Sequence, residues 1–233
     1  MAEKIRYTRR DLKGPDEFIS TFGRFVEWCK ANRSKVVIAL IAFHAVLFLY
    51  LGTGAYFRWQ ERKAGTDLWP YLEQAREILA APAVGATGDI AAVEQSIASL
   101  VKQHAGTRAA LYGQCSLGSI AFSRGDYEGS AARFREGIQA GKDVGVVRFL
   151  LRKGLAASLE AKGDYAGAAA SYREAAEAAG GPQLATQARF GEARALELSG
   201  KKKEAAALYR KIIEENPETR IKDQIDIKIA HME

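Results

Sequence analysis

A pattern of three residues recurs at nearly constant intervals in the second half of the chain. Each copy has a glycine first, a small side chain five residues later and an aromatic side chain nine residues later. The copies are Gly125, Ser130 and Phe134; Gly163, Ala168 and Tyr172; and Gly200, Ala205 and Tyr209. The glycines are therefore 38 and 37 residues apart. Periods of about 20 to 50 residues are typical of stacked units, so the pattern predicts a repeat array.

The residue types indicate how each unit folds. Glycine ends a helix without a steric penalty, the small residue lets two helices approach closely, and the aromatic ring fills the space beside it. We therefore expect each unit to be a helix-turn-helix hairpin. Gly88, Val93 and Ile97 stand at the same offsets and predict a weaker hairpin before the three strong ones.

The pattern resembles the tetratricopeptide repeat, whose 34-residue unit carries Leu-Gly, then Gly-x-Tyr-x-x-Ala-x-x-x-aromatic, and a proline near its end. Leu117-Gly118 and Pro217 match this motif, whereas Ala156 and Ala193 replace the glycine of the first helix and Lys202 replaces the turn tyrosine. The longer period implies enlarged loops near residues 141–145 and 180–182.

The resemblance covers about residues 66–233 and implies an all-α fold. We expect an α-solenoid of hairpins over residues 66–217. A capping helix over residues 218–233 is expected to cover the last apolar surface with Ile221, Ile225, Ile227, Ile229 and Met232.

A run of 22 residues, Val36–Phe57, carries no charge apart from a protonated His44. At about 1.5 Å per residue a helix of this length spans roughly 33 Å, enough to cross a hydrocarbon core of about 30 Å. Basic and aromatic residues flank the run, namely Lys35, Tyr50, Tyr56, Arg58, Trp59, Arg62 and Lys63. We expect a transmembrane helix with an extension over residues 35–63. A cleaved signal peptide fits less well, because its charged region would be 35 residues long and no clean cleavage site follows.

His44 lies inside this span. Polar groups in a bilayer are costly, which favours a functional intramembrane contact. The alternative is a neutral imidazole that bonds a carbonyl of its own helix, and both readings stay open.

The residues before the span divide into two parts. Residues 1–14 form a basic tail, and residues 15–34 predict an amphipathic helix lying in the membrane interface. Its apolar residues recur at helical spacing, at Phe18, Phe22, Phe25, Val26 and Cys29. A soluble helix packed on a partner protein is the alternative.

Charge favours one orientation and argues against nucleic acid. Four basic residues lie close to each end of the span, and the basic residues of the tail favour a cytoplasmic N-terminus. The repeat part would then lie outside the cytoplasm, in the periplasm. Residues 58–233 hold 34 − 9 = 25 basic and 28 − 5 = 23 acidic side chains, too balanced for a nucleic-acid footprint.

Motifs for catalysis are nearly absent. His44, His104 and His231 are scattered, so neither a metal nor a cofactor is expected, and no glycine-rich phosphate loop occurs. Residues 99–102 read Ser-x-x-Lys, which we attribute to chance. Cys29 and Cys115 would lie on opposite sides of the membrane; Cys115 is expected to be buried, with an intermolecular disulfide as the alternative. We expect a protein that is not an enzyme.

The resemblance also implies a concave groove for polypeptides, lined by the first helix of each hairpin. The family's inward positions fall on Tyr112, Cys115, Ser119, Phe122, Leu150, Lys153, Ala157, Glu160, Gln187, Phe190, Arg194 and Glu197. All of these except Cys115, Leu150 and Ala157 form the predicted binding site, although some of them are expected to pack between helices. Arg194 is expected to matter far more for binding than for folding, as aromatic and Arg side chains do at hot spots.

The complete layout is similar to the ancillary subunit of the bacterial Sec translocon (the YfgM type). That resemblance implies a single-pass inner-membrane protein that assists the transfer of exported chains to chaperones. Residues 4–20 have no counterpart in that subunit. The alternative function is a structural assembly subunit of an envelope complex, or a scaffold that associates with itself.

Overall fold

The computed structural model describes residues 17–80, 87–141 and 145–232. Within these residues the chain forms helices and no strand, which confirms the all-α fold class. The basic tail at residues 1–14 and part of the expected loop at 141–145 lie outside the described residues. The helices are α1 (Glu17–Ala31), α2 (Arg33–Ala80), α3 (Thr87–Gln103), α4 (Arg108–Ser123), α5 (Tyr127–Gln139), α6 (Gly145–Ala161), α7 (Tyr165–Glu177), α8 (Pro182–Leu198), α9 (Lys202–Glu215) and α10 (Lys222–Ala230).

The chain divides into two compact units, Met1–Phe57 and Arg58–Glu233. Helix α2 contributes to both, because it continues without a break through Pro70 to Ala80. The boundary that we expected between residues 63 and 66 is therefore not a break in the helix. The two units are described separately below.

The first unit contains α1 and the apolar part of α2. The most apolar 18-residue window of α2 has a mean hydropathy of 2.3 and holds no buried residue. By length and composition this helix can cross a membrane. In α1, Phe22, Phe25 and Trp28 are all exposed, and the rings of Phe25 and Trp28 stack at 6.5 Å. Both helices therefore present apolar side chains that this unit does not cover.

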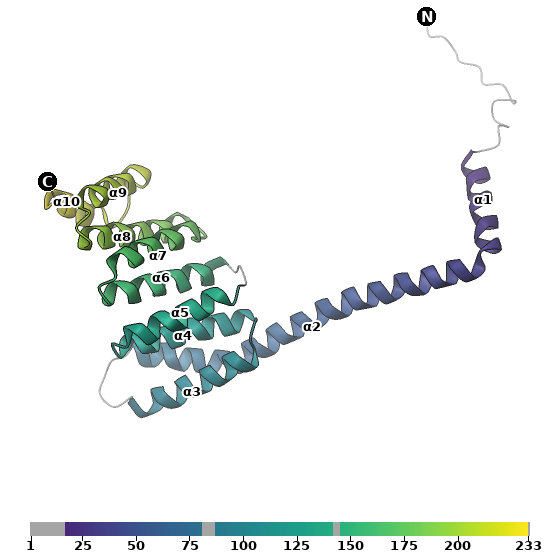
Figure 1. Ribbon diagram of the computed structural model, residues 1–233, viewed down its shortest axis with the longest axis horizontal. Coiled ribbons are helices and arrows are strands. Elements are labelled where there is room, and N and C mark those ends of the chain that lie inside the picture. Colours follow the sequence, from purple (N-terminus) through teal and green to yellow (C-terminus); the bar gives the residue numbers. More distant parts are fainter. Residues whose placement is uncertain (1–16, 81–86, 142–144, 233) are drawn as a thin grey trace, which may run out of the picture. The chain divides into compact units, whose positions relative to one another are not determined.

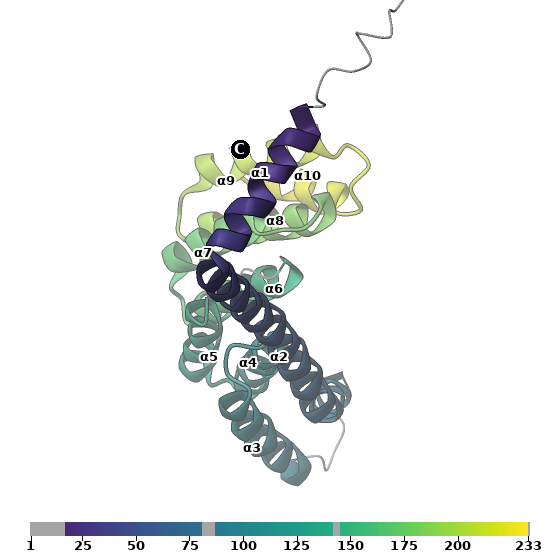
Figure 2. The same cartoon turned by 90° about the vertical axis from the view of Figure 1, so that its right-hand side faces the viewer.

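The second unit is a stack of helical hairpins, in which each helix packs against the next one along the chain (Figure 1). The pairs α4/α5, α6/α7 and α8/α9 are the three hairpins predicted from the strong repeats. The last turns of α2 pack with α3 and α4 through a cluster that includes Leu68, Val93 and Ile97. Val93 and Ile97 thus occupy the core positions predicted for the weaker unit, and Figure 2 shows α3 next to α4.

Each strong hairpin turns at its motif glycine. Gly125, Gly163 and Gly200 have φ of 78°, 83° and 83°, a left-handed conformation that favours glycine. In the first two hairpins the next residue is an aspartate that caps the second helix. The Asp126 carboxylate accepts a hydrogen bond from the Gly129 N–H at 2.8 Å, and Asp164 accepts one from the Gly167 N–H at 2.9 Å.

The motif aromatics pack against glycines of the first helices. A Cβ atom on Gly118 would lie 2.7 Å from the Phe134 ring, and one on Gly154 would lie 2.3 Å from it. A Cβ atom on Gly191 would lie 2.7 Å from the Tyr172 ring. Phe134 and Tyr172 therefore also hold their hairpins against the next one. Gly154 and Gly191 precede Ala156 and Ala193 by two residues, and the motif comparison missed them.

The C-terminal helix covers the end of the array. Ile225 is fully buried, and Ile221, Ile229 and Met232 pack against the same cluster. Ile227 is 59% exposed, so it does not join the apolar surface that we expected it to cover. The helix occupies residues 222–230 of the expected segment, because residues 217–221 form a turn and irregular structure before it.

Candidate functional site

The predicted binding residues lie on the first helices of three successive hairpins. Helix α4 carries Tyr112, Ser119 and Phe122, α6 carries Lys153 and Glu160, and α8 carries Gln187, Phe190, Arg194 and Glu197. These helices pack in order, α4 against α6 and α6 against α8. The structure therefore places the predicted residues on neighbouring helices, but it brings only part of the set together.

Four of the nine residues meet in one pocket of about 240 Å³. The predicted members are Lys153, Gln187, Phe190 and Arg194, and the residues that prediction missed are Tyr172, Gly191 and Ile221. The Lys153 ammonium donates to the Gln187 side-chain oxygen at 3.3 Å, linking α6 to α8. The pocket thus combines an apolar wall with amide and cationic groups.

Arg194 and Glu160 join α8 to α6. Arg194 donates from Nε and Nη2 to the two Glu160 oxygens at 2.8 and 2.9 Å. The Tyr172 hydroxyl of α7 donates to Glu160 at 3.0 Å and accepts from Arg194 at 3.3 Å. Three helices from two hairpins therefore meet in one polar cluster, Glu160–Tyr172–Arg194.

The electrostatics of this cluster follow from its contacts. The hydrogen bond to Glu160 raises the pKa of Arg194 above its ordinary value. Burial and then the Glu160 charge raise the pKa of Tyr172 to about 12, because both disfavour the phenolate. At neutral pH the Arg194 guanidinium and the Tyr172 phenol both therefore keep their protons.

A second cluster of the same kind lies one hairpin further along. The Tyr209 hydroxyl donates to Glu197 at 3.3 Å, and the Lys228 ammonium of α10 donates to the same carboxylate at 2.8 Å. The tyrosine follows the glutamate by 12 residues in both clusters. Helix α10 thus supplies the cation that α8 supplies in the first cluster. Sequence comparison missed Lys228, since α10 carries no repeat motif.

These contacts change the expected role of Arg194. We expected Arg194 to matter far more for binding than for folding, because its removal leaves the glycine, small and aromatic contacts of the repeat intact. The bidentate pair instead ties two hairpins together beside a Glu160 side chain that is 17% exposed. Arg194 therefore contributes to the fold as well as lining the pocket.

The other predicted residues lie apart from this pocket. Tyr112 lines a separate cavity between α2 and α4. Ser119 is exposed, and its hydroxyl donates to the Cys115 carbonyl at 2.9 Å. Phe122 is 38% exposed and packs beside the Tyr127 ring at 5.2 Å. In the first strong hairpin, Phe122 and Phe134 stand where the later hairpins have the glutamate and tyrosine of the polar clusters.

The structure also shows the surroundings of His44 and of the two cysteines. His44 Nδ1 lies 2.7 Å from the Leu40 carbonyl oxygen, the bond within its own helix that we considered as one alternative. Both Cys29 and Cys115 are free thiols. Cys115 packs against the cluster around Leu111, and burial raises the pKa of its thiol to about 12. The thiolate, which is the reactive form, is therefore strongly disfavoured at neutral pH.

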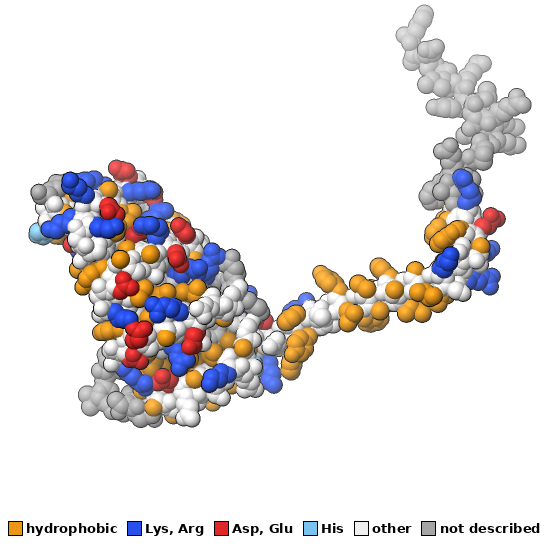
Figure 3. Space-filling model, viewed as in Figure 1, with side chains coloured by type: hydrophobic (Ala, Val, Ile, Leu, Met, Phe, Trp, Pro, Cys, Tyr) orange, Lys and Arg blue, Asp and Glu red, His pale blue; other side chains and the backbone are white. Residues whose placement is uncertain are grey.

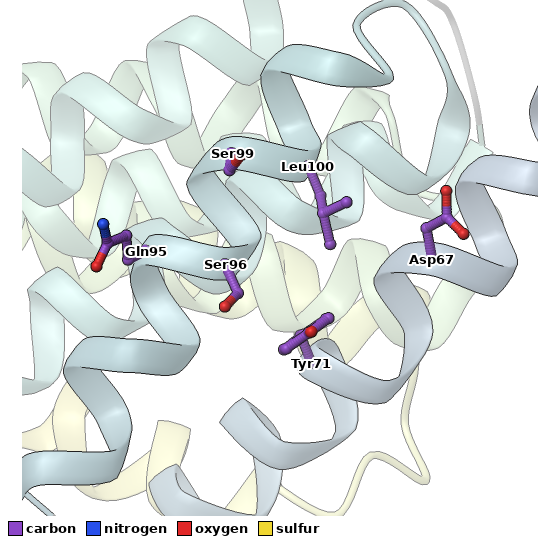
Figure 4. Close-up of a pocket in the computed structure, with 6 residues that line it drawn as sticks. All are labelled: Asp67, Tyr71, Gln95, Ser96, Ser99 and Leu100. Carbon is purple, nitrogen blue, oxygen red and sulfur yellow. The ribbon is translucent and has the colours of Figure 1, made fainter.

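A further cavity of about 520 Å³ lies between α2 and α3 and is lined by Asp67, Tyr71, Gln95, Ser96, Ser99 and Leu100 (Figure 4). Asp67 is held by His104, whose Nε2 lies 2.9 Å from the carboxylate. Ser99 is the first residue of the Ser-x-x-Lys motif, and Lys102 is exposed to solvent. Across the described ranges, no three His, Cys, Asp or Glu side chains are grouped to hold a metal ion.

Charges of both signs are mixed over the repeat helices on the face shown in Figure 3. Many of them are ion pairs that join helices, such as Arg152 with Glu174 at 3.1 Å and Arg173 with Glu192 at 2.7 Å. A mixed surface of this kind suits a protein ligand better than a polyanion.

Comparison with known proteins identifies a family that matches this chain. The family described as a tetratricopeptide repeat-like domain matches the chain over residues 27–233, most of its length. A search of curated proteins found no match to the chain.

Proposed function

We propose that this chain, which belongs to the tetratricopeptide repeat-like domain family, is a scaffold that binds segments of other proteins and catalyses no reaction. Repeat arrays of this kind present extended surfaces built from successive first helices. The observation that carries the proposal is the pocket formed by Lys153, Gln187, Phe190 and Arg194. Its aromatic ring can receive an apolar side chain, and its amide and cations can bond to a peptide backbone or carboxylate.

The proposal includes a single membrane anchor. The apolar part of α2 is the anchor, and α1 lies in the interface with its apolar face in the bilayer. The excess of basic residues before Val36 supports a cytoplasmic N-terminus and a periplasmic repeat unit in a bacterial inner membrane. In this arrangement the pocket is available to exported polypeptides.

The partner class follows from the resemblance to the ancillary Sec translocon subunit. We propose that the protein assists translocon- or chaperone-linked handling of exported chains. Such chains are extended and expose apolar side chains beside their backbone amides. A pocket with one aromatic wall and a polar rim fits a ligand of that description.

The proposal is tested by crosslinking in intact cells. A photoreactive amino acid replaces Gln187 in the full chain, and a matched variant carries it at the exposed Lys203. We expect exported polypeptides, translocon subunits or envelope chaperones to be captured from position 187 and not from position 203. Equal capture from both positions, or capture of cytoplasmic proteins alone, contradicts the proposal.

A second candidate function, a structural assembly subunit, is favoured by two exposed apolar side chains near the C-terminus. Leu198 is 48% exposed and Ile227 is 59% exposed. Stacking on another copy or on a larger envelope complex would cover them. Sedimentation velocity of the full chain and of its Ile227→Glu variant, both in detergent, distinguishes the assembly subunit from the protein-binding scaffold. Oligomers that the substitution dissociates favour the assembly subunit.

A further inference from the structure

The second unit has an exposed tryptophan that the repeat pattern does not explain. Trp69 of α2 is 64% exposed, the largest exposed fraction of any large apolar side chain among the described residues from Arg58 onwards. It lines a cavity of about 430 Å³ together with Gly65 and Leu72 of α2 and Tyr112 of α4. A tryptophan left in water at the mouth of a cavity is typical of a binding surface.

The cavity has room beside the indole ring. A Cβ atom on Gly65 would meet no atom within 4 Å, so the helix surface is open at this point. Leu72 and Tyr112 are half-buried and form an apolar wall. A large apolar side chain can therefore enter between the two helices and contact both aromatic rings.

The rim of the cavity is basic. Arg62 and Arg108 line it and both are exposed. Neither guanidinium has an ion-pair partner among the described residues, in contrast to the paired Arg152, Arg173 and Arg194. Glu61 also lines the cavity, but its carboxylate accepts the backbone N–H of Arg108 at 3.0 Å and caps the start of α4, which leaves the two guanidinium groups as the cations of the rim. The rim is thus complementary to an acidic ligand.

We infer that this cavity, the Trp69 pocket, is a second docking site for a polypeptide segment with a large apolar side chain next to an acidic residue. The apolar side chain packs between Trp69 and Tyr112, and the carboxylate pairs with Arg62 or Arg108. The site goes beyond the proposed function, because it lies on α2 and α4, whereas the pocket around Phe190 is built by α6, α7, α8 and the segment before α10.

The experiment uses the full chain in detergent micelles and fluorescein-labelled ten-residue peptides. One peptide has a central Phe-Leu pair flanked by aspartates, a second has lysines in place of the aspartates, and a third has serines in place of Phe-Leu. Binding is measured by fluorescence anisotropy. We expect the acidic apolar peptide to bind at least tenfold more tightly than the other two.

Substitutions in the Trp69 pocket test whether the peptide binds there. Trp69→Ala is expected to weaken binding of the acidic apolar peptide at least tenfold, and Arg62→Gln combined with Arg108→Gln several-fold. Val146→Ala removes another exposed apolar side chain, and Lys203→Gln another exposed cation; both are expected to leave binding unchanged. Circular dichroism of each variant establishes that it is folded.

Several results overturn the inference. They are absence of binding by the acidic apolar peptide, equal binding of the lysine peptide, unchanged binding by a folded Trp69→Ala variant, and displacement of the peptide by phosphatidylglycerol vesicles, which indicates a lipid headgroup. A dimer in sedimentation velocity that Trp69→Ala dissociates also overturns it, because the occupant is then a second copy. Crosslinking from position 187 is a separate measurement, so this inference and the proposed function can fail independently.

Discussion

Arg194 of α8 and Glu160 of α6 form a bidentate ion pair, with N–O distances of 2.8 and 2.9 Å. The pair joins two hairpins, and Tyr172 of the intervening helix donates to the same carboxylate. Glu197, Tyr209 and Lys228 repeat the arrangement at the end of the array. The first cluster therefore marks a junction between two hairpins, beside the pocket proposed to bind protein segments, and the second joins the last hairpin to the capping helix.

Arg194→Ala is expected to destabilise the protein by about 1 to 2 kcal/mol, because charge-assisted hydrogen bonds are lost beside a mostly buried carboxylate. The measurement is denaturant unfolding of the full chain in detergent. Arg133→Ala is the control, since its pair with Glu136 at 3.3 Å is exposed on one helix. We expect that control to change stability by less than about 0.5 kcal/mol. Equal effects of the two substitutions would show that the junction pair contributes no more than a surface pair.

Gly154→Ala is expected to destabilise the protein by about 1 to 3 kcal/mol, because the new methyl group overlaps the Phe134 ring. Helix propensity alone predicts the opposite sign, a gain of about 1 kcal/mol. Gly65→Ala provides the matched control, since its Cβ meets nothing within 4 Å. Thermal unfolding of both variants compares the two effects. A Gly154→Ala variant as stable as Gly65→Ala would contradict the close approach of Phe134 to α6.

The hairpins and the contact between Phe134 and Gly154 show which parts of the fold the sequence could predict. The glycine, small and aromatic motif predicted the hairpins, because helix termination and the spacing of core residues are local properties. The turns at Gly125 and Gly163 lie between the expected helices. The contact of Phe134 with Gly154 was missed because it joins two units, and the motif describes only one.

Other parts of the candidate sites lie outside the repeat pattern altogether. Lys228 belongs to the capping helix, and Ile221 precedes it, so neither has an equivalent in a hairpin motif. Trp69 lies on the continuation of the apolar helix, which carries no motif glycine before it. A search for exposed aromatic residues on helices flanking the array would have found Trp69, whereas no sequence signal pairs Lys228 with Glu197.

Protease accessibility tests the orientation of the chain. The basic residues before Val36 favour a cytoplasmic N-terminus. Protease added to spheroplasts is therefore expected to digest the repeat unit from outside. The readout is immunoblotting with tags at the two ends, and a cytoplasmic marker protein is the control for lysis. Protection of the repeat unit until the cells are lysed would reverse the assignment.

Stability is expected to fall as pH rises above about 9. The pKa values of Cys115 and Tyr172 are both raised to about 12 in the folded protein, from ordinary values of 9.0 and 10.0. Their stabilising contributions are complete below the ordinary values and are lost as pH rises towards 12, because the unfolded chain then binds fewer protons. Each group contributes a slope of up to about 1.4 kcal/mol per pH unit. Denaturant unfolding between pH 8 and 11 measures the slope, and Tyr172→Phe should flatten it above pH 10. An unchanged slope in that variant would exclude Tyr172 as a source.

Lys201→Ser is expected to stabilise the protein, because the third strong hairpin lacks the cap that Asp126 and Asp164 provide in the others. Lys201 is the N-cap of α9 and makes no side-chain capping bond. A serine here can accept a hydrogen bond from the backbone N–H of Glu204, as the Asp126 and Asp164 side chains accept one from the third residue after them. The expected gain is about 1 kcal/mol, and the substitution sacrifices only an exposed 3.5 Å contact between Lys201 and Glu204. Lys203→Ser changes the same residue type inside the helix, where serine has a lower helix propensity than lysine, and is expected to be neutral or slightly destabilising. Thermal unfolding of the full chain measures both variants, and equal melting temperatures would show that the start of α9 is frayed and does not gain from a cap.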